Sequence, residues 1–369
     1  MASRSSATPL ALLFAAMVVY ASLYPFEGWR LPGHAPWIFL IAPLSRYWTW
    51  FDVLSNLLGY APLGFFLALG FQRSGRGAWS WVLAVLLPLG LSLTLETIQN
   101  FLPRRIPSNL DLGLNLAGAL LGASSAWLLE RLGGLQRWSE FRRLWFEPGA
   151  HGSLVLLALW PFALLYPASV PFGLGQVRER IEETLWPLFA DTPFQDWLPD
   201  SLSGEVTADV SAPVACIALG LLVPVFMGYA DIRTPARRMA FLGVLLLAAF
   251  GVSGLSSALT YGPEHAWAWI ATPVMQGVGA ACAVAVLALA LPARISQVCM
   301  VCALVVSLGL LNRLPSSAYL DQSLEVWEQG RFIRFHGVSQ WLGWLWPFAA
   351  LVFGVRAVTR PPLRQGTRH

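Results

Sequence analysis

Long apolar stretches recur along the whole sequence and leave few folds open to it. A helix must carry about 20 apolar residues to cross the hydrocarbon core of a bilayer. By that measure we predict ten spans, at residues 9–24, 51–71, 78–101, 111–130, 153–172, 212–230, 239–260, 267–291, 296–312 and 341–358. The expected fold class is therefore all-α, a polytopic bundle of about ten transmembrane helices.

The composition agrees with a membrane protein rather than a soluble one. Hydrophobic residues make up 56% of the chain and charged residues 12%, against about 25% charged residues in typical soluble domains. The mean hydropathy is +0.58. Membrane lipids are the expected partners. The formal net charge of +4 does not predict a nucleic-acid partner, and we expect none.

The distribution of arginine indicates an orientation, because cytoplasmic loops of membrane proteins carry an excess of positive charge. Most arginines fall in segments that lie inside if the N-terminus is cytoplasmic, whereas residues 173–211 carry eight acidic residues and two arginines. These features predict a multi-pass membrane protein with both termini in the cytoplasm.

Three segments outside the predicted spans have amphipathic patterns. Residues 176–189 and 313–340 are expected to form amphipathic helices in outer loops, either resting on the outer leaflet or packing over the bundle. Residues 136–146 mix arginine with tryptophan and phenylalanine. That mixture predicts an interfacial segment on the anionic cytoplasmic leaflet.

Polar side chains are concentrated between residues 51 and 121. An ionisable group inside a span costs roughly 2.5–3.5 kcal/mol on insertion scales, so such groups indicate a functional site. Helical spacing places each group of them on one face, and the order of the spans puts the groups at one depth, which predicts a shallow polar pocket at the outer surface. The candidate site residues are Asp52 and Asn56 in the second span, Ser92, Glu96 and Gln99 in the third, Arg104 and Arg105 in the loop that follows, and Asp111 and Asn115 in the fourth.

Two glycines continue the polar stripe of the fourth span. Gly118 and Gly122 follow Asn115 at helical spacing. A small-xxx-small pair lets two membrane helices approach closely. We therefore expect this face of the fourth span to be buried against its neighbours.

The residue types of the expected pocket permit several roles. Arg104 and Arg105 could form ion pairs with the carboxylates in a structural network. They could equally bind a lipid phosphate through bidentate hydrogen bonds from the guanidinium group. The carboxylates offer oxygen ligands for a divalent cation, the one candidate cofactor, or a general base. Spacing alone does not choose among these roles, and the metal ligands and catalytic residues stay unassigned.

The polar pattern resembles that of the VanZ-like family of bacterial integral membrane proteins, which is named for a teicoplanin-resistance protein. The matching elements, within about residues 10–130, are Leu23-Tyr24-Pro25-Phe26, Asp52-x-x-x-Asn56, Gly59-x-x-Pro62-x-Gly64, Ser92-x-x-x-Glu96-x-x-Gln99, Arg105, and Asp111-x-x-x-Asn115-x-x-Gly118-x-x-x-Gly122. Ser108 stands where relatives often carry a further acid, which weakens a metal site.

The resemblance implies two domains and a role in the envelope. Residues 1–150 are expected to form a VanZ-like membrane domain of about four spans, and residues 151–369 a membrane extension of about six. The resemblance implies a location in the bacterial inner membrane and a role at the cell envelope, in some members as lower susceptibility to lipoglycopeptide antibiotics. The resemblance implies no particular reaction.

Three functions fit these residues and compete. The first is recognition of an anionic lipid, a lipid-linked glycan or a lipoglycopeptide antibiotic at the outer leaflet. The second is an enzyme acting on a lipid-linked substrate through carboxylate or metal chemistry. The third is a transporter in which Glu96 carries a proton. The inner halves of the second to fourth spans are nearly all apolar, which disfavours a transporter, and no nucleophile accompanies the carboxylates. We favour binding.

Overall fold

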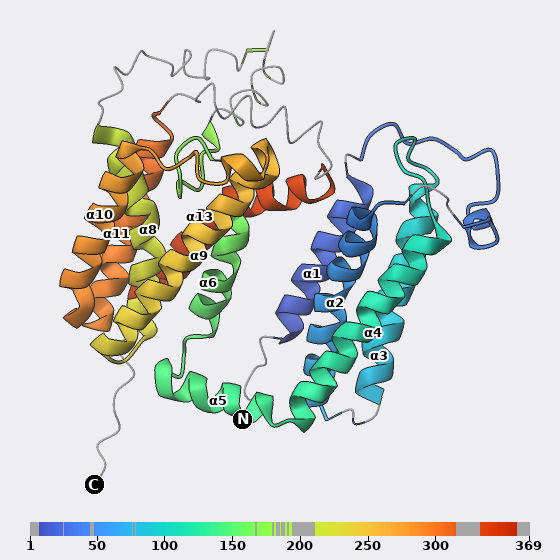
Figure 1. Cartoon of the computed structure of the whole chain (residues 1–369), viewed down its shortest axis with the longest axis horizontal. Coiled ribbons are helices and arrows are strands. Elements are labelled where there is room, and N and C mark those ends of the chain that lie inside the picture. The colour runs from blue at the N-terminus through green and yellow to red at the C-terminus, as the bar shows by residue number, and fades with distance from the viewer. Residues whose placement is uncertain are drawn as a thin grey trace. The chain divides into compact units, whose positions relative to one another are not determined.

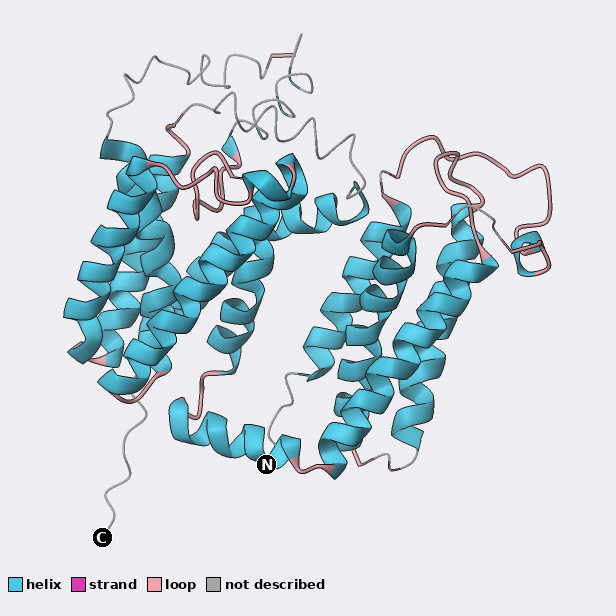
Figure 2. Cartoon of the chain, viewed as in Figure 1, coloured by secondary structure: helices cyan, strands magenta, loops and turns pink. Residues whose placement is uncertain are grey.

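The computed structural model describes residues 7–24, 26–44, 48–75, 77, 79–166, 168–178, 181, 185, 189, 192–193, 211–314 and 333–359. Within these ranges the secondary structure is helical, without a strand (Figure 2). Eight of the described helices are long and apolar enough to cross a membrane. The expected all-α, polytopic bundle is thus confirmed, and the chain is a multi-pass membrane protein.

The chain divides into two compact units, Met1–Arg142 and Arg143–His369. In the first unit α2 contacts each of the other three long helices. The short helix η1, Ile38–Leu40, lies in the segment between α1 and α2 (Figure 1). The long helices of this unit are α1 (Ala7–Leu23), α2 (Trp50–Arg73), α3 (Trp79–Gln99) and α4 (Asn109–Arg131).

Side-chain caps define where two of these helices begin. Thr49 and Asp52 form a capping box at the start of α2, in which each side chain bonds to the other's backbone N–H. Ser108 caps α4, because its hydroxyl accepts hydrogen bonds from the N–H groups of Leu110 and Asp111. Such caps satisfy backbone donors that the first turn of a helix leaves unpaired.

The closest approach in the first unit is between α2 and α4. A Cβ atom at Gly118 would overlap the carbonyl oxygen of Leu57, and one at Gly122 would overlap that of Ala61. Gly64 on α2 faces Ala119 equally closely. The two helices can therefore pack backbone against backbone only because glycine occupies these positions.

The second unit is built around α8, whose residues Ile217, Leu221, Met227 and Tyr229 are almost completely buried. This helix contacts α6, α9, α10 and α11, and α13 packs on α6 and α11. The helices are α6 (His151–Ala163), α8 (Ser211–Asp231), α9 (Pro235–Tyr261), η3 (Pro263–His265), α10 (Thr272–Leu287), η4 (Ala288–Ala290), α11 (Ala293–Leu311) and α13 (Ile333–Thr359).

Two predicted spans are shorter helices than expected. Helix α1 has 17 residues, and the predicted span 153–172 is helical only in α6, which has 13 residues. After Ala163 the chain leaves helical geometry, and Phe172 and Gly175 take φ angles of 63° and 92°. Residues in this left-handed region cannot continue a right-handed helix.

Of the three predicted amphipathic segments, the structure fully describes one. The helices expected at 176–189 and 313–340 lie largely outside the described residues. The expected interfacial segment at 136–146 overlaps helix α5, Gly134–Trp145, which has no buried residue. Trp138 and Phe141 are exposed on α5 with their rings stacked 5.6 Å apart. This exposed aromatic pair fits the predicted interfacial location.

Candidate functional site

A buried polar cluster joins α2, α3 and α4. Ser92 is completely buried on α3, and its hydroxyl accepts a hydrogen bond of 2.9 Å from Nδ2 of Asn115 on α4. The Tyr60 hydroxyl on α2 is hydrogen-bonded to Ser92 and lies near the Glu96 carboxylate. The structure therefore brings residues from three of the predicted polar faces into one cluster.

Tyr60 was missing from the residues that sequence reasoning singled out. An aromatic residue in an apolar run usually belongs to the hydrophobic core. A positional signal was nevertheless present, because Tyr60 follows Asp52 and Asn56 at i+8 and i+4. On an α-helix these three positions share one face.

Two amide atoms beside this cluster have no hydrogen-bond partner within the described part of the chain. Nδ2 of Asn56, a donor, and Oδ1 of Asn115, an acceptor, are both buried without a hydrogen bond. Buried polar atoms are paired in the large majority of cases. Nδ2 of Asn56 can therefore donate a hydrogen bond to ordered water or a ligand, and Oδ1 of Asn115 can accept one.

Glu96 and Gln99 connect α3 to other parts of the unit. The Glu96 side chain is buried, and its Oε2 accepts a 2.9 Å hydrogen bond from the backbone N–H of Ser108. Gln99 donates from Nε2 to the carbonyl oxygen of Ser22, at 3.1 Å. Because Ser108 caps α4, Glu96 fixes the start of α4 against the last turns of α3.

The three carboxylates do not form one chelating group. Asp52 accepts hydrogen bonds from the backbone N–H and the hydroxyl of Thr49, at 3.0 and 2.8 Å. Asp111 lies in the first turn of α4, where a negative charge is favoured by the helix dipole. Among the described residues no group of three His, Cys, Asp or Glu side chains is placed to hold a metal ion. These carboxylates therefore do not fit a shared divalent cation.

Arg105 holds the end of α1. Its Nη2 atom donates to the carbonyl oxygens of Ala21 and Tyr24, at 2.9 and 2.6 Å, and its Nε donates to Tyr24 at 3.2 Å. A cation at a helix C-terminus satisfies carbonyl groups that lack an intrahelical partner and complements the dipole. Arg105 therefore positions the α3–α4 loop over α1.

Arg104 has a different environment although it is adjacent in sequence. Its side chain is exposed, and no hydrogen bond or ion pair joins it to the described part of the chain. Ile106 in the same loop is 87% exposed. The loop thus presents a cation and an aliphatic side chain outward.

The segment 26–44 extends this exposed surface. Hydrogen bonds tie it to the residue after α3 and to the start of α4: Asn100 Nδ2 donates to the Pro36 carbonyl oxygen at 2.7 Å, and Asn109 Nδ2 donates to that of Ala42 at 2.6 Å. Both lie at the same end of the four helices (Figure 1). The segment exposes large apolar side chains, namely Trp29, Leu31, Trp37, Ile38, Leu40, Ile41 and Leu44.

Comparison with known proteins identifies the part of the chain that carries this site. Residues 4–130 match the family model described as VanZ/LLP1. This N-terminal part of the chain belongs to the VanZ-like family. All the candidate residues, from Asp52 to Asn115, lie within the matched range. Searches of the curated proteins and of the solved structures found no match for the chain.

The geometry of the VanZ-like region separates two kinds of site residue. Ser92, Glu96, Gln99 and Arg105 make hydrogen bonds that fix the helices and the α3–α4 loop. Arg104 instead faces outward. These hydrogen-bonded residues therefore support a surface that the exposed residues present.

Proposed function

We propose that the protein acts at the bacterial cell envelope, where its VanZ-like region binds the anionic head group of a lipid or of a lipid-linked envelope intermediate. The observation that carries this proposal is the contrast between the two arginines of the α3–α4 loop. Arg105 is committed to the carbonyl oxygens of α1, whereas Arg104 is exposed beside a surface rich in Trp, Leu and Ile. Aromatic side chains favour the membrane interface, where lipid head groups lie.

The carboxylates favour binding over acid–base chemistry. Asp52 accepts from Thr49 and Glu96 from the Ser108 N–H, and both contacts hold helix ends. A catalytic base instead needs to reach a proton of the substrate.

In the proposed orientation the protein lies in the inner membrane with both termini on the cytoplasmic side. The α3–α4 loop and segment 26–44, together called the VanZ-like surface, then face the outer leaflet. Altered susceptibility to a lipoglycopeptide such as teicoplanin is the envelope phenotype that the family suggests.

Replacing Arg104 with glutamine should weaken binding of phosphatidylglycerol roughly fivefold, since one basic residue near an anionic surface contributes about 1 kcal/mol. Binding of phosphatidylcholine should not change. Native mass spectrometry of purified protein with graded amounts of each lipid measures both affinities. The matched control is Arg143→Gln, another exposed arginine, in α5. Equal losses in the two variants would show that the α3–α4 loop holds no dedicated anion site.

The proposed orientation is tested by labelling in intact cells. In a background without the native cysteines, Ile106→Cys should react with a membrane-impermeant maleimide, because this position is 87% exposed in the α3–α4 loop. Ser139→Cys, on the exposed surface of α5, should react only after the cells are opened. The opposite pattern would place the VanZ-like surface in the cytoplasm.

A further inference from the structure

The second unit contains an irregular segment among helices of membrane length. Residues 164–166 and 168–177 follow α6 without helical structure, yet Tyr166, Val170, Phe172 and Leu174 are all buried. At membrane depth, irregular backbone is tolerated where it is buried in protein or lines a cavity. This segment lines a cavity of about 520 Å³. Cavities of this size, within about 300–1,000 Å³, accept drug-sized ligands.

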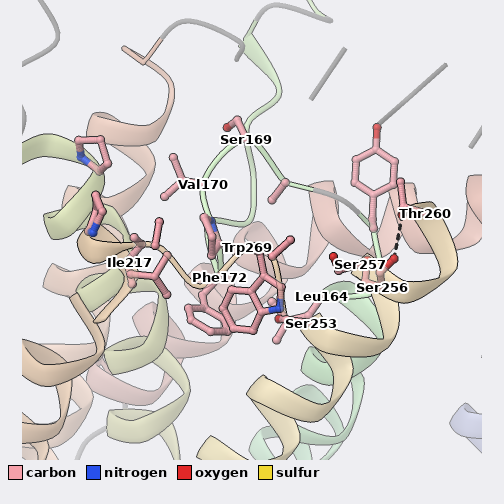
Figure 3. Close-up of a pocket in the computed structure, with 18 of the residues that line it drawn as sticks. Leu164, Ser169, Val170, Phe172, Ile217, Ser253, Ser256, Ser257, Thr260 and Trp269 are labelled. Atoms are coloured by element: carbon pink, nitrogen blue, oxygen red, sulfur yellow. Dashed lines mark hydrogen bonds between the residues drawn. The ribbon is translucent and has the colours of Figure 1, made fainter. Parts of the chain in front are cut away.

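The walls of this cavity are mostly apolar and carry no charged side chain among the described lining residues. Figure 3 shows Phe172 and Trp269 next to each other near the centre, with Ile217 of α8 to the left and the hydroxyl-bearing residues of α9 to the right. Val274 of α10 completes the apolar part. An ionised group would lose its hydration here without gaining a charged partner.

Phe172 is held in a strained conformation at this wall. Its φ of 63° lies in the left-handed region, which a bulky residue rarely adopts. A Cβ atom at Gly220 would overlap the Phe172 carbonyl oxygen, so α8 holds this backbone closely. The Phe172 ring packs edge-on against Trp269, with ring centroids 5.6 Å apart, and in a tilted arrangement against Phe250 at 6.2 Å. Backbone strain that packing maintains is concentrated at ligand clamps and active sites.

Four hydroxyl groups line one face of α9 at helical spacing, from Ser253, Ser256, Ser257 and Thr260. Ser256 donates to the Leu165 carbonyl oxygen and Ser257 to that of His265, each at 2.7 Å. Thr260 donates to the Ser256 carbonyl oxygen at 2.8 Å. A hydroxyl has one proton and two lone pairs. The hydroxyl oxygens of Ser256 and Ser257 therefore retain the capacity to accept a hydrogen bond from a ligand, whereas their protons are already engaged.

We propose that this cavity binds a neutral lipid that carries a hydroxyl group. The hydrocarbon chain lies against Phe172, Trp269 and Val274, and the lipid hydroxyl donates to the oxygens of α9. This site lies in the second unit, and it differs from the anionic head-group site of the VanZ-like region in both residues and ligand charge. Either site can therefore fail its test without affecting the other.

Photolabelling of the full-length protein in phosphatidylcholine nanodiscs tests the proposal. The probe is hexadecanol with a diazirine on its chain, and adducts are mapped by peptide mass spectrometry. We expect adducts within residues 164–178 and 253–274, suppressed by excess unlabelled hexadecanol and not by ionised hexadecanoate. Adducts spread over the outward faces of the helices, or equal competition by hexadecanoate, would overturn the proposal.

A pair of variants on α9 adds a structural control. Ser253→Phe places a ring in the cavity and should reduce labelling roughly fivefold or more, the fold-change that corresponds to the lower end of the usual cost of overpacking a filled site. Gly251→Phe adds the same ring two residues away, where a Cβ meets nothing within 4 Å, and should label like wild type. Equal labelling of the two variants would overturn the proposal. If Ser253→Phe does not fold, the competition experiment on the wild-type protein still tests the proposal by itself.

Discussion

Replacing Gly122 with alanine is expected to destabilise the protein by about 1–3 kcal/mol, the usual range for overpacking a close-packed site. An added Cβ would overlap the Ala61 carbonyl oxygen and lie 2.8 Å from the Phe65 backbone nitrogen. Both obstacles are backbone atoms of α2, so no side-chain rotation relieves the clash. Helices α2 and α4 would have to separate, and their shared contacts would weaken along the whole interface.

The free energy of unfolding in mixed detergent micelles, followed by circular dichroism, measures this effect. Gly113→Ala is the matched control, because Gly113 lies on the same helix and its added Cβ meets nothing within 4 Å. Alanine is a better helix former than glycine by about 1 kcal/mol, so the control should be unchanged or more stable. Equal stability of the two variants would contradict the close packing of α2 and α4.

Arg105→Gln is the second substitution with a large expected effect. Hydrogen bonds from a charged donor contribute about 1.5–3 kcal/mol each, and the three bonds from Arg105 end on two carbonyl oxygens, of Ala21 in the last turn of α1 and of Tyr24 just after it. Glutamine is shorter and uncharged, so it cannot span the same pair of acceptors. We expect a loss of roughly 2–4 kcal/mol in the free energy of unfolding, within the range for breaking a buried network.

Arg104→Gln is the control for this loss, because its exposed side chain should leave stability unchanged. The two arginines are thus expected to separate two measurements: Arg104→Gln lowers affinity for anionic lipid, and Arg105→Gln lowers stability. Hydrogen exchange at the last turn of α1 should also increase in Arg105→Gln. A variant of Arg105 as stable as wild type would remove its positioning role.

The sequence alone was sufficient to predict the class of fold. A bilayer requires helices of nearly fixed length, so spans such as Ser211–Asp231 and Ala293–Leu311 can be recognised from their apolar runs. The prediction of a continuous span at 153–172 was wrong beyond Ala163, because hydropathy does not register backbone conformation. Phe172 and Gly175 leave helical φ while their side chains and neighbours stay apolar.

The candidate site was predictable as a set of faces but not as a set of contacts. Helical periodicity placed Ser92 and Asn115 on inward faces, and their hydrogen bond follows from the packing of α3 against α4. No periodicity predicts that Glu96 accepts the Ser108 N–H, because that contact depends on how the loop between the two helices folds back.

The two arginines show most clearly where sequence stops and tertiary structure begins. By itself the sequence predicted that arginines and carboxylates lie toward one end of an apolar helical bundle, because charge and helical period are local properties. Arg104 and Arg105 are chemically identical and adjacent, so nothing local distinguishes them. The conformation of the loop over α1 places Arg105 within reach of the carbonyl oxygens of Ala21 and Tyr24, whereas Arg104 faces outward. Side-chain direction in a loop depends on contacts between segments distant in the chain, such as the end of α1 and the start of α4.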